Sequence, residues 1–139
     1  MSEVKDGLYY TKTHQWYDPD SGKVGLTAYA ADQLGEISFV DVDPLNGMDV
    51  EQIEMDGDEP AGAPLDAAVE SNKAIGDIYS PVSGTVTDTN GELLDWPEKV
   101  NEDPYGEGWL FVVDASDFDG EKGNLLDADA YKEFTESLE

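Results

Sequence analysis

Residues 65–80, LDAAVESNKAIGDIYS, contain the pattern that decides the fold. Apolar and polar residues alternate from Leu65 to Glu70, and an extended segment resumes at Ile75, so two short strands joined by a tight polar turn are predicted. Asn72 favours the turn because asparagine tolerates left-handed backbone angles and can bond its own main chain. The pattern therefore predicts a β-hairpin with Lys73 at or beside its tip. The residues that form its immediate context are Glu70, Ser71, Asn72 and Ala74.

Two interpretations of Lys73 follow from this pattern. An exposed hairpin lysine commonly serves only solubility, since most surface lysines have no specific partner. Alternatively, the hairpin presents the amine for chemistry or for covalent attachment. The rest of the sequence is needed to choose between them.

Composition predicts one acidic domain over residues 1–139. A chain of 139 residues can bury about two-thirds of its unfolded surface in a single core, and 39% hydrophobic residues suffice for one. The formal net charge is −26, from 33 acidic and 7 basic residues, and every basic residue is lysine. Phosphate backbones and anionic lipids are bound largely by Lys and Arg, so nucleic-acid and membrane-surface partners are disfavoured.

The charge also suggests adaptation to a salty cytosol, because salt relieves self-repulsion by shortening the Debye length from about 10 Å at 0.1 M to about 3 Å at 1 M. The sequence has no cysteine, which excludes a disulfide framework, a thiolate nucleophile and a zinc-thiolate site. No signal-peptide core or membrane-spanning apolar run is visible, so a cytoplasmic location and a monomeric state are expected.

The remaining pattern is rich in short strands. Strands are predicted over residues 7–11, 14–17, 23–26, 37–42, 85–87 and 109–113, with strand fragments and loop over the acidic stretch 48–64. Helices are predicted over 28–34, capped by Thr27 and ended by Gly35, and over 97–100, capped by Asp95. Leu126, Ala130, Phe134 and Leu138 recur at four-residue spacing and predict a C-terminal amphipathic helix. A mainly β sandwich or partly closed barrel follows.

The inventory of reactive side chains does not favour an enzyme. His14 is the only histidine and lies in a predicted strand beside Trp16, where a packed histidine is favoured over a catalytic one. Residues 18–22 and 117–120 resemble fragments of calcium loops, but neither continues to the required bidentate glutamate, so no metal site is predicted. Glu70 and Asp77 flank Lys73 and favour its ammonium form, which argues against a Schiff-base lysine. Covalent attachment to an exposed Lys73 is the chemistry that remains.

At this point the sequence resembles the glycine cleavage system H proteins, the lipoyl carriers of that system. The resemblance covers nearly the whole chain and rests on these stretches: YTK at 10–12 with His14 and Trp16, VGLT at 24–27 through Ala30 to QLGE at 33–36, VES at 69–71 with Lys73 and Ala74, DIYSPVSG at 77–84, and NEDPYGEGWL at 101–110. The lysine segment is shared with other lipoyl domains. The last stretch and the His-x-Trp segment are what point to the H proteins.

The resemblance implies a barrel-sandwich hybrid, the fold of lipoyl domains, with (R)-lipoate in amide linkage to Lys73 as N6-lipoyllysine. It implies a carrier protein, not an enzyme, that takes part in glycine catabolism. Its partners would be the pyridoxal-phosphate-dependent glycine decarboxylase (P protein), the folate-dependent aminomethyltransferase (T protein), dihydrolipoamide dehydrogenase (L protein) and the lipoate attachment enzymes. A tethered reactive group of this kind raises the effective concentration at successive active sites.

The resemblance also implies a surface cleft that holds the loaded arm through Thr13, Gln15 and Asp77. Gln15 stands where the family has glutamate, which removes the charge-assisted part of a hydrogen bond to an ammonium. Asn72 replaces a usual aliphatic residue, and the acidic segment 48–60 is longer than in the family. Two other functions stay open: a lipoyl domain of a 2-oxo-acid dehydrogenase complex, and a lipoyl-like interaction module without the modification.

Overall fold

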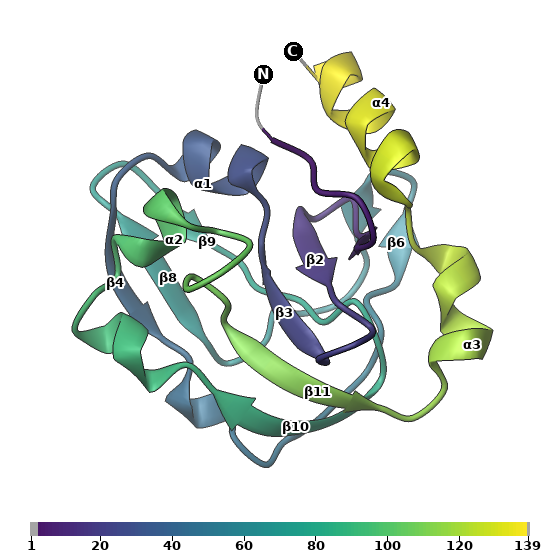
Figure 1. The fold of residues 1–139 in the computed structure, drawn as a ribbon, viewed down its shortest axis with the longest axis horizontal. Coiled ribbons are helices and arrows are strands. Elements are labelled where there is room, and N and C mark those ends of the chain that lie inside the picture. The colour runs from purple at the N-terminus through teal and green to yellow at the C-terminus, as the bar shows by residue number, and fades with distance from the viewer. Residues whose placement is uncertain (1–2, 139) are drawn as a thin grey trace.

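The computed structural model describes residues 3–138, and its strands form two main sheets (Figure 1). Within that range the larger sheet has six strands, and each pairs with its neighbours in antiparallel register. Their order is β1 (Tyr9–Tyr10), β2 (Gln15–Tyr17), β3 (Lys23–Leu26), β11 (Phe111–Ala115), β10 (Gly84–Thr89) and β5 (Asp49–Val50).

The smaller sheet carries the predicted lysine hairpin. Its order is β4 (Ile37–Asp41), β8 (Ala68–Ser71) and β9 (Ile75–Gly76), again antiparallel. The acidic stretch predicted as strand fragments and loop contains β5 and a separate two-stranded hairpin of β6 (Met55–Asp56) and β7 (Glu59–Pro60). The mainly β prediction is therefore confirmed.

The main core lies between the two sheets. Val40 on β4 pairs with Val69 on β8, and both are almost fully buried. Val24 on β3 and Phe111 on β11 pair across the larger sheet and belong to the same buried cluster. Because side chains alternate between the faces of a strand, the residues next to Val40 and Val69 point outward.

Short helices close the ends of the sheets. The predicted first helix is α1 (Ala28–Leu34): the Thr27 hydroxyl accepts a hydrogen bond from the Ala30 N–H, and Gly35 ends the helix at φ 80°. The others are η1 (Asp43–Leu45), η2 (Gly91–Leu94), α2 (Lys99–Glu102), α3 (Phe118–Glu121), η3 (Lys122–Asn124) and α4 (Ala128–Leu138).

One helix prediction needs correction, and the predicted C-terminal helix is confirmed. The helix predicted over 97–100 is α2, which begins at Lys99, and Asp95 does not cap it because Asp95 ends the preceding turn η2. The C-terminal helix α4 is present, but its buried residues are Tyr131 and Thr135, whereas Leu138 is 48% exposed. The Tyr131 ring stacks on Tyr10 with centroids 4.5 Å apart, so an aromatic contact with β1 sets the rotation of the helix.

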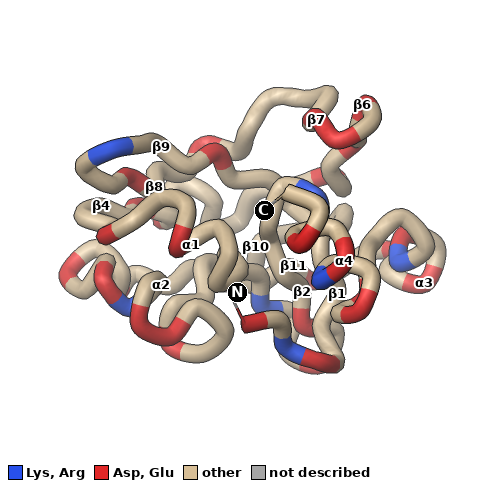
Figure 2. The backbone as a smooth tube through the Cα atoms, turned by 90° about the horizontal axis from the view of Figure 1, so that it is seen from above, with Lys and Arg blue, Asp and Glu red and all other residues tan. Residues whose placement is uncertain are grey.

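Acidic positions occur along most of the chain in Figure 2, in the loops and helices above all, and the lysines are few among them. The lysine at the β8–β9 hairpin lies at an edge of the molecule, away from the termini.

Candidate functional site

Ser71 holds the lysine hairpin in shape. Its hydroxyl accepts hydrogen bonds from the backbone N–H groups of Lys73 (3.3 Å) and Ala74 (3.1 Å), and its own N–H donates to the Ala74 carbonyl (2.9 Å). The same hydroxyl donates to the Leu34 carbonyl at the end of α1 (2.6 Å). A serine that bonds the backbone ahead of it is a common way to build a turn. The turn is thereby fixed to α1.

The predicted role of Asn72 is wrong. In the described residues the only non-glycine residue with a positive φ is His14, at 68°, so Asn72 does not adopt the left-handed conformation. Its side chain is exposed, and the turn bonds come from Ser71. The prediction of a hairpin with Lys73 in its turn is confirmed, with β8 and β9 paired on either side.

The Lys73 side chain lies over Gly35, the residue that ends α1. A Cβ atom built on Gly35 would lie 3.0 Å from Lys73 Cε and 3.6 Å from Lys73 Nζ. Lys73 is exposed, and its ammonium has no carboxylate partner within the part of the chain that the structure describes. The amine is therefore accessible from solvent and lies next to the C-terminal end of a helix, where a positive charge is favourable.

Asn101 supports the helix end beneath Lys73. Its side-chain N–H₂ donates to the Gly35 carbonyl (2.7 Å), and its side-chain oxygen accepts from the Ile37 N–H (2.8 Å). One amide thus joins the end of α1 to the start of β4. Asn101 lies on α2, so this contact links that helix to the glycine on which Lys73 rests, and no local pattern in the sequence indicates it.

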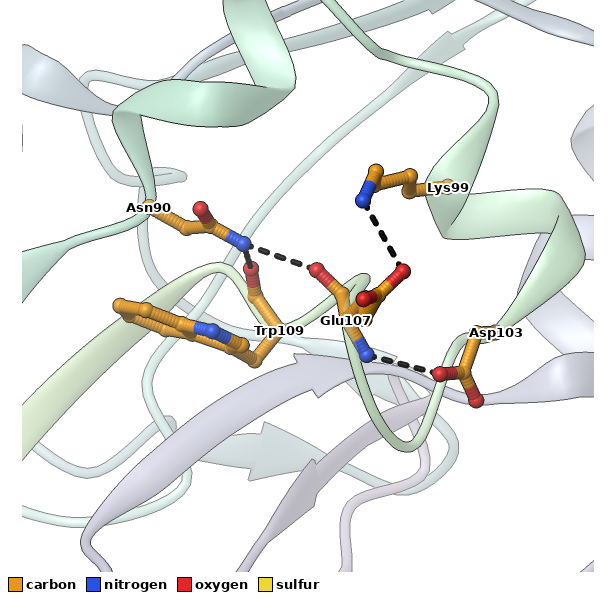
Figure 3. Close-up of polar contacts among 5 residues, drawn as sticks. All are labelled: Asn90, Lys99, Asp103, Glu107 and Trp109. Atoms are coloured by element: carbon orange, nitrogen blue, oxygen red, sulfur yellow. Dashed lines mark hydrogen bonds and ion pairs between the residues drawn. The ribbon is translucent and has the colours of Figure 1, made fainter.

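Within that loop, polar contacts fix the backbone (Figure 3). The Asn90 side-chain amide donates to the carbonyls of Glu107 (2.9 Å) and Trp109 (2.8 Å), and an oxygen of Asp103 accepts from the Glu107 N–H (2.9 Å). Lys99 forms an ion pair with the Glu107 carboxylate at 2.9 Å. Side-chain bonds therefore tie the 101–110 stretch to Asn90 and to Lys99 on α2.

Thr13 and Gln15 are brought together. The Thr13 hydroxyl donates to the Gln15 side-chain oxygen, and the Gln15 side-chain amide donates to the Thr13 carbonyl (2.9 Å). The Gln15 side chain is fully buried, whereas Thr13 is partly exposed. Thr13 is therefore the member of this pair that reaches the surface.

Asp77, the third predicted cleft residue, is exposed just beyond β9. Within residues 3–138 the structure shows no hydrogen bond that Asp77 accepts from Thr13 or Gln15. The predicted cleft therefore stays a prediction, with Thr13 and Asp77 as its solvent-facing members.

His14 is a packed residue, as predicted, although it precedes β2 instead of lying within it. Its Nδ1 shares a hydrogen bond of 2.8 Å with the Tyr131 hydroxyl, which is also 2.7 Å from the Thr27 hydroxyl oxygen. Burial lowers the pKa of His14 to about 4. The histidine joins the start of β2 to α1 and α4 and is neutral at pH 7.

The aspartates of the two calcium-loop fragments serve local turns. An Asp18 oxygen accepts from the Asp20 N–H, and Asp117 caps α3 by accepting from the Gly120 N–H. Across residues 3–138, no three His, Asp or Glu side chains gather in a group that could hold a metal ion. In the same range, every helix is too short or too polar to cross a bilayer.

The comparisons with known proteins agree on one family. The family model described as "Glycine cleavage H-protein" matches residues 8–138. A glycine cleavage system H protein from Rubrobacter xylanophilus is 44% identical over 133 residues, covering 94% of each chain. Another from Marinobacter nauticus is 41% identical over 136 residues, covering 96% of this chain and 95% of its own.

A chain from Haloarcula marismortui is 41% identical over 133 residues, covering 94% of this chain and 95% of its own. The crystal structure of a glycine cleavage system H protein from Mycobacterium marinum superposes with a TM-score of 0.73 at 29% identity, covering 95% of this chain and 98% of that one. That agreement confirms the predicted fold. The chain belongs to the glycine cleavage H-protein family, the lipoyl carriers of the glycine cleavage system.

Proposed function

We propose that this chain carries (R)-lipoate in amide linkage on Lys73 and that the whole of residues 1–139 acts as one carrier domain. The observation that carries the proposal is the exposed amine of Lys73, which pairs with no carboxylate of residues 3–138, at the turn of a hairpin held by Ser71. An accessible primary amine on a rigid support is what acylation requires, and it needs no pocket of its own. Lipoate supplies a disulfide that accepts the aminomethyl group. When that group has been passed on, the lipoyl group is left as a dithiol.

The chain itself contributes a fixed support that presents Lys73 to the partner enzymes. The bond from Ser71 to the Leu34 carbonyl fixes the hairpin to α1, and Asn101 fixes α1 to β4. The flexible part of the arm therefore begins at the Lys73 side chain and not in the backbone. A short flexible tether on a rigid base keeps the effective concentration of the attached group high at each partner.

The proposed partners are glycine decarboxylase, aminomethyltransferase, dihydrolipoamide dehydrogenase and the lipoate attachment enzymes. Membership of the family supports interaction with the enzymes of the glycine cleavage system. The cytoplasmic location and the monomeric state stay predictions. Adaptation to high salt also stays a proposal, and its support is the net charge of −26.

Intact mass spectrometry tests the attachment. The protein is expressed in a lipoate-replete host, and we expect a lipoyl-sized mass increment that disappears in Lys73→Ala. Lys132→Ala is the matched control, because Lys132 is also exposed but lies on α4, and it should keep the increment. A wild-type chain without the increment, or an increment that survives in Lys73→Ala, contradicts the proposal.

For the loaded arm we propose a resting place at Thr13 and Asp77, with Gln15 acting through Thr13. The Thr13 hydroxyl donates its one proton to the Gln15 side-chain oxygen, to which the Thr11 hydroxyl also donates at 3.4 Å. Thr13 then keeps one lone pair free to accept from an amine. Gln15 thus compensates for the missing carboxylate by turning the Thr13 hydroxyl into an acceptor.

The amide NMR signals of the lipoylated protein test this placement. Incubation with glycine and the decarboxylase should shift the Thr13 and Asp77 signals, and Thr13→Val should abolish the shift at Asp77. Thr85→Val is the control, because Thr85 lies on β10 and its hydroxyl donates to Asp49 on β5. Shifts confined to the hairpin contradict this resting place.

A further inference from the structure

Residues 54–64, here called the flap, contain the separate β6–β7 hairpin, which projects at the edge of the molecule in Figure 2. We propose that the flap is hinged and closes over the loaded arm, with the Asp58 carboxylate as its contact to the ammonium group of the arm. The inference rests on the proposed function, because it assumes an arm on Lys73 that carries an aminomethyl group. It adds a moving element to the resting place at Thr13 and Asp77.

The flap is joined to the rest of the protein at two hinge points. Before it, the Ile53 N–H donates to the Ser80 carbonyl (2.9 Å), and after it the Leu65 N–H donates to the Ile78 carbonyl (2.7 Å). Between these two bonds, β6 and β7 pair with each other in a sheet of their own. Every residue of the flap is exposed or half-buried. A segment with so few buried contacts opens at a low cost in free energy.

One ion pair fastens the flap to the body of the protein. Lys12 Nζ donates to Asp58 Oδ1 at 2.7 Å, and the Asp58 side chain is 66% exposed. No other ion pair of residues 3–138 involves the flap. An exposed ion pair favours one state by about fivefold at most. The flap is therefore held closed weakly and can open.

The flap forms one wall of a hollow in the protein surface. Met55 and Gly57 line the hollow from the flap, Thr11 and Lys12 line it from the segment before β2, and Leu126 lines it from the segment before α4. Its volume is about 550 Å³, including the space open to solvent. Sites for small molecules commonly have this size. The hollow is therefore large enough for the end of a lipoyl arm.

The hollow lies beside the proposed resting place of the arm. Thr11 lines the hollow, and its hydroxyl oxygen is 2.8 Å from that of Thr13. Ile53 also lines the hollow and bonds the carbonyl of Ser80, which follows Asp77 by three residues. An arm that rests at Thr13 and Asp77 therefore has its end next to the flap.

Asp58 has room for a second cation. Lys12 bonds its Oδ1 atom, and no side chain of residues 3–138 donates a hydrogen bond to its Oδ2 atom. A carboxylate offers about four acceptor positions. Asp58 Oδ2 can thus accept a hydrogen bond from the ammonium of the aminomethyl group while Lys12 stays in place. Such charge-assisted bonds are stronger than neutral ones.

This contact couples closure of the flap to loading of the arm. The oxidised lipoyl group carries a disulfide and the reduced group carries thiols, so neither offers an ammonium to Asp58. The loaded arm does, and a ligand that binds one state more tightly shifts the population towards that state. Closure in turn restricts the access of water to the carried group.

Paramagnetic relaxation measured by NMR on the full chain tests the latch before loading. The chain has no cysteine, so Glu59→Cys on the flap takes a single thioether-linked nitroxide, and the Leu126 amide across the hollow reports its proximity. Asp58→Asn should lower the relaxation enhancement at Leu126 by about 40%, because loss of a fivefold preference takes the closed fraction from about 0.8 to about 0.5. Asp56→Asn is the matched control.

Asp56→Asn makes the same change of charge on the same hairpin, but Asp56 forms no ion pair within residues 3–138. Its enhancement at Leu126 should equal that of the wild type. Amide chemical shifts outside the flap, expected to match the wild type in both variants, exclude loss of the fold as the cause.

A second measurement tests the contact with the arm. Glycine and the decarboxylase load the lipoylated chain, and the enhancement at Leu126 should rise in the wild type. Lys12→Gln should start from a lower value but keep the rise, because the Asp58 carboxylate remains. Asp58→Asn should show no rise. The thioether link resists the thiol that loading produces on the arm.

Two outcomes would overturn the inference. One is an equal enhancement at Leu126 in Asp58→Asn and Asp56→Asn, and the other is a loaded wild-type chain whose enhancement does not change. In both cases a lipoyl-sized mass increment on Lys73 would still support the proposed function. A wild-type chain that never gains this increment would contradict that function itself, and with it the role of the flap.

Discussion

The Lys73 side chain lies in the space that a side chain on Gly35 would occupy. A Cβ on Gly35 would be 3.0 Å from Lys73 Cε, and Gly35 has φ 80°, a value that strongly favours glycine. The end of α1 thus provides both the backbone turn and the surface on which the lysine rests. This contact joins two segments that are far apart in the sequence.

Gly35→Ala should therefore loosen Lys73 and destabilise the protein. The strained backbone should cost about 1–3 kcal/mol, measured by chemical denaturation. The new methyl group should also displace the lysine, because 3.0 Å is too close for two carbon atoms. The side-chain relaxation of ¹³C-labelled Lys73 should show faster motion than in wild type.

Gly47→Ala is the control for backbone strain alone. Gly47 has φ 83°, and a Cβ there would meet no atom of residues 3–138 within 4 Å. This variant should lose stability without changing the motion of Lys73. Equal Lys73 relaxation in Gly35→Ala and wild type would show that the lysine does not rest on Gly35.

Asn101→Ala should weaken the junction between α1 and β4. It removes the bonds to the Gly35 carbonyl and the Ile37 N–H and leaves both groups without those partners. The expected loss of unfolding free energy is about 1–3 kcal/mol. Asn124→Ala, an exposed residue that donates to the Gln52 side-chain oxygen, should change stability by less than about 0.5 kcal/mol. An Asn101→Ala chain as stable as the control would be evidence against the junction.

His14 should make the fold sensitive to acid. Its pKa is lowered from 6.5 to about 4 by burial, so the unfolded chain binds the proton more readily than the folded chain. The stability that neutral His14 contributes is complete above pH 6.5 and is lost as the pH falls from 6.5 towards 4.

The non-titrating variant His14→Asn isolates this effect, because asparagine tolerates the positive φ at this position. Between about pH 7 and about pH 4.5 the wild type should lose about 2 kcal/mol more than His14→Asn, after allowance for partial exposure of the ring. The carboxylates titrate in both proteins and cancel in the comparison. Parallel pH profiles would mean that the histidine is not linked to folding.

Salt should raise the melting temperature. The net charge of −26 disfavours the compact state, and raising NaCl from about 0.1 M to about 1 M shortens the Debye length from about 10 Å to about 3 Å. Sucrose at equal osmolality is the control, since it does not screen charge, and it should stabilise the protein less. A melting temperature that is insensitive to NaCl would refute salt adaptation.

The sequence predicted the local structure where one segment contains all the information. The β8–β9 hairpin follows from alternation on both sides of a polar turn, and α1 follows from Thr27 and Gly35 at its ends. The prediction for the turn residue was wrong, because a contact with a distant segment decides which side chain bonds the turn. Ser71, not Asn72, forms the turn bonds, because the Leu34 carbonyl of α1 holds the Ser71 hydroxyl in place.

The same reason accounts for α4 and Gln15. Four-residue spacing predicted a helix but not its rotation, which is set by the stacking of Tyr131 on Tyr10 and by the Tyr131 bond to His14. Gln15 was predicted to face the arm, but pairing of β2 with β3 places its side chain in the interior, and Thr13 takes the surface position.

By itself, the sequence determined that Lys73 lies in a hairpin turn of a mainly β protein, because strand alternation and turn chemistry are local properties. Only the tertiary structure decided what surrounds the lysine. Its side chain contacts Gly35, Leu34 accepts a hydrogen bond from Ser71, and Asn101 bonds the Gly35 carbonyl. Phe39, Glu70 and Ile75 lie opposite one another across the sheet that carries the hairpin. Those neighbours come from segments far apart in the chain. Their proximity depends on strand register and helix packing, which no single segment specifies.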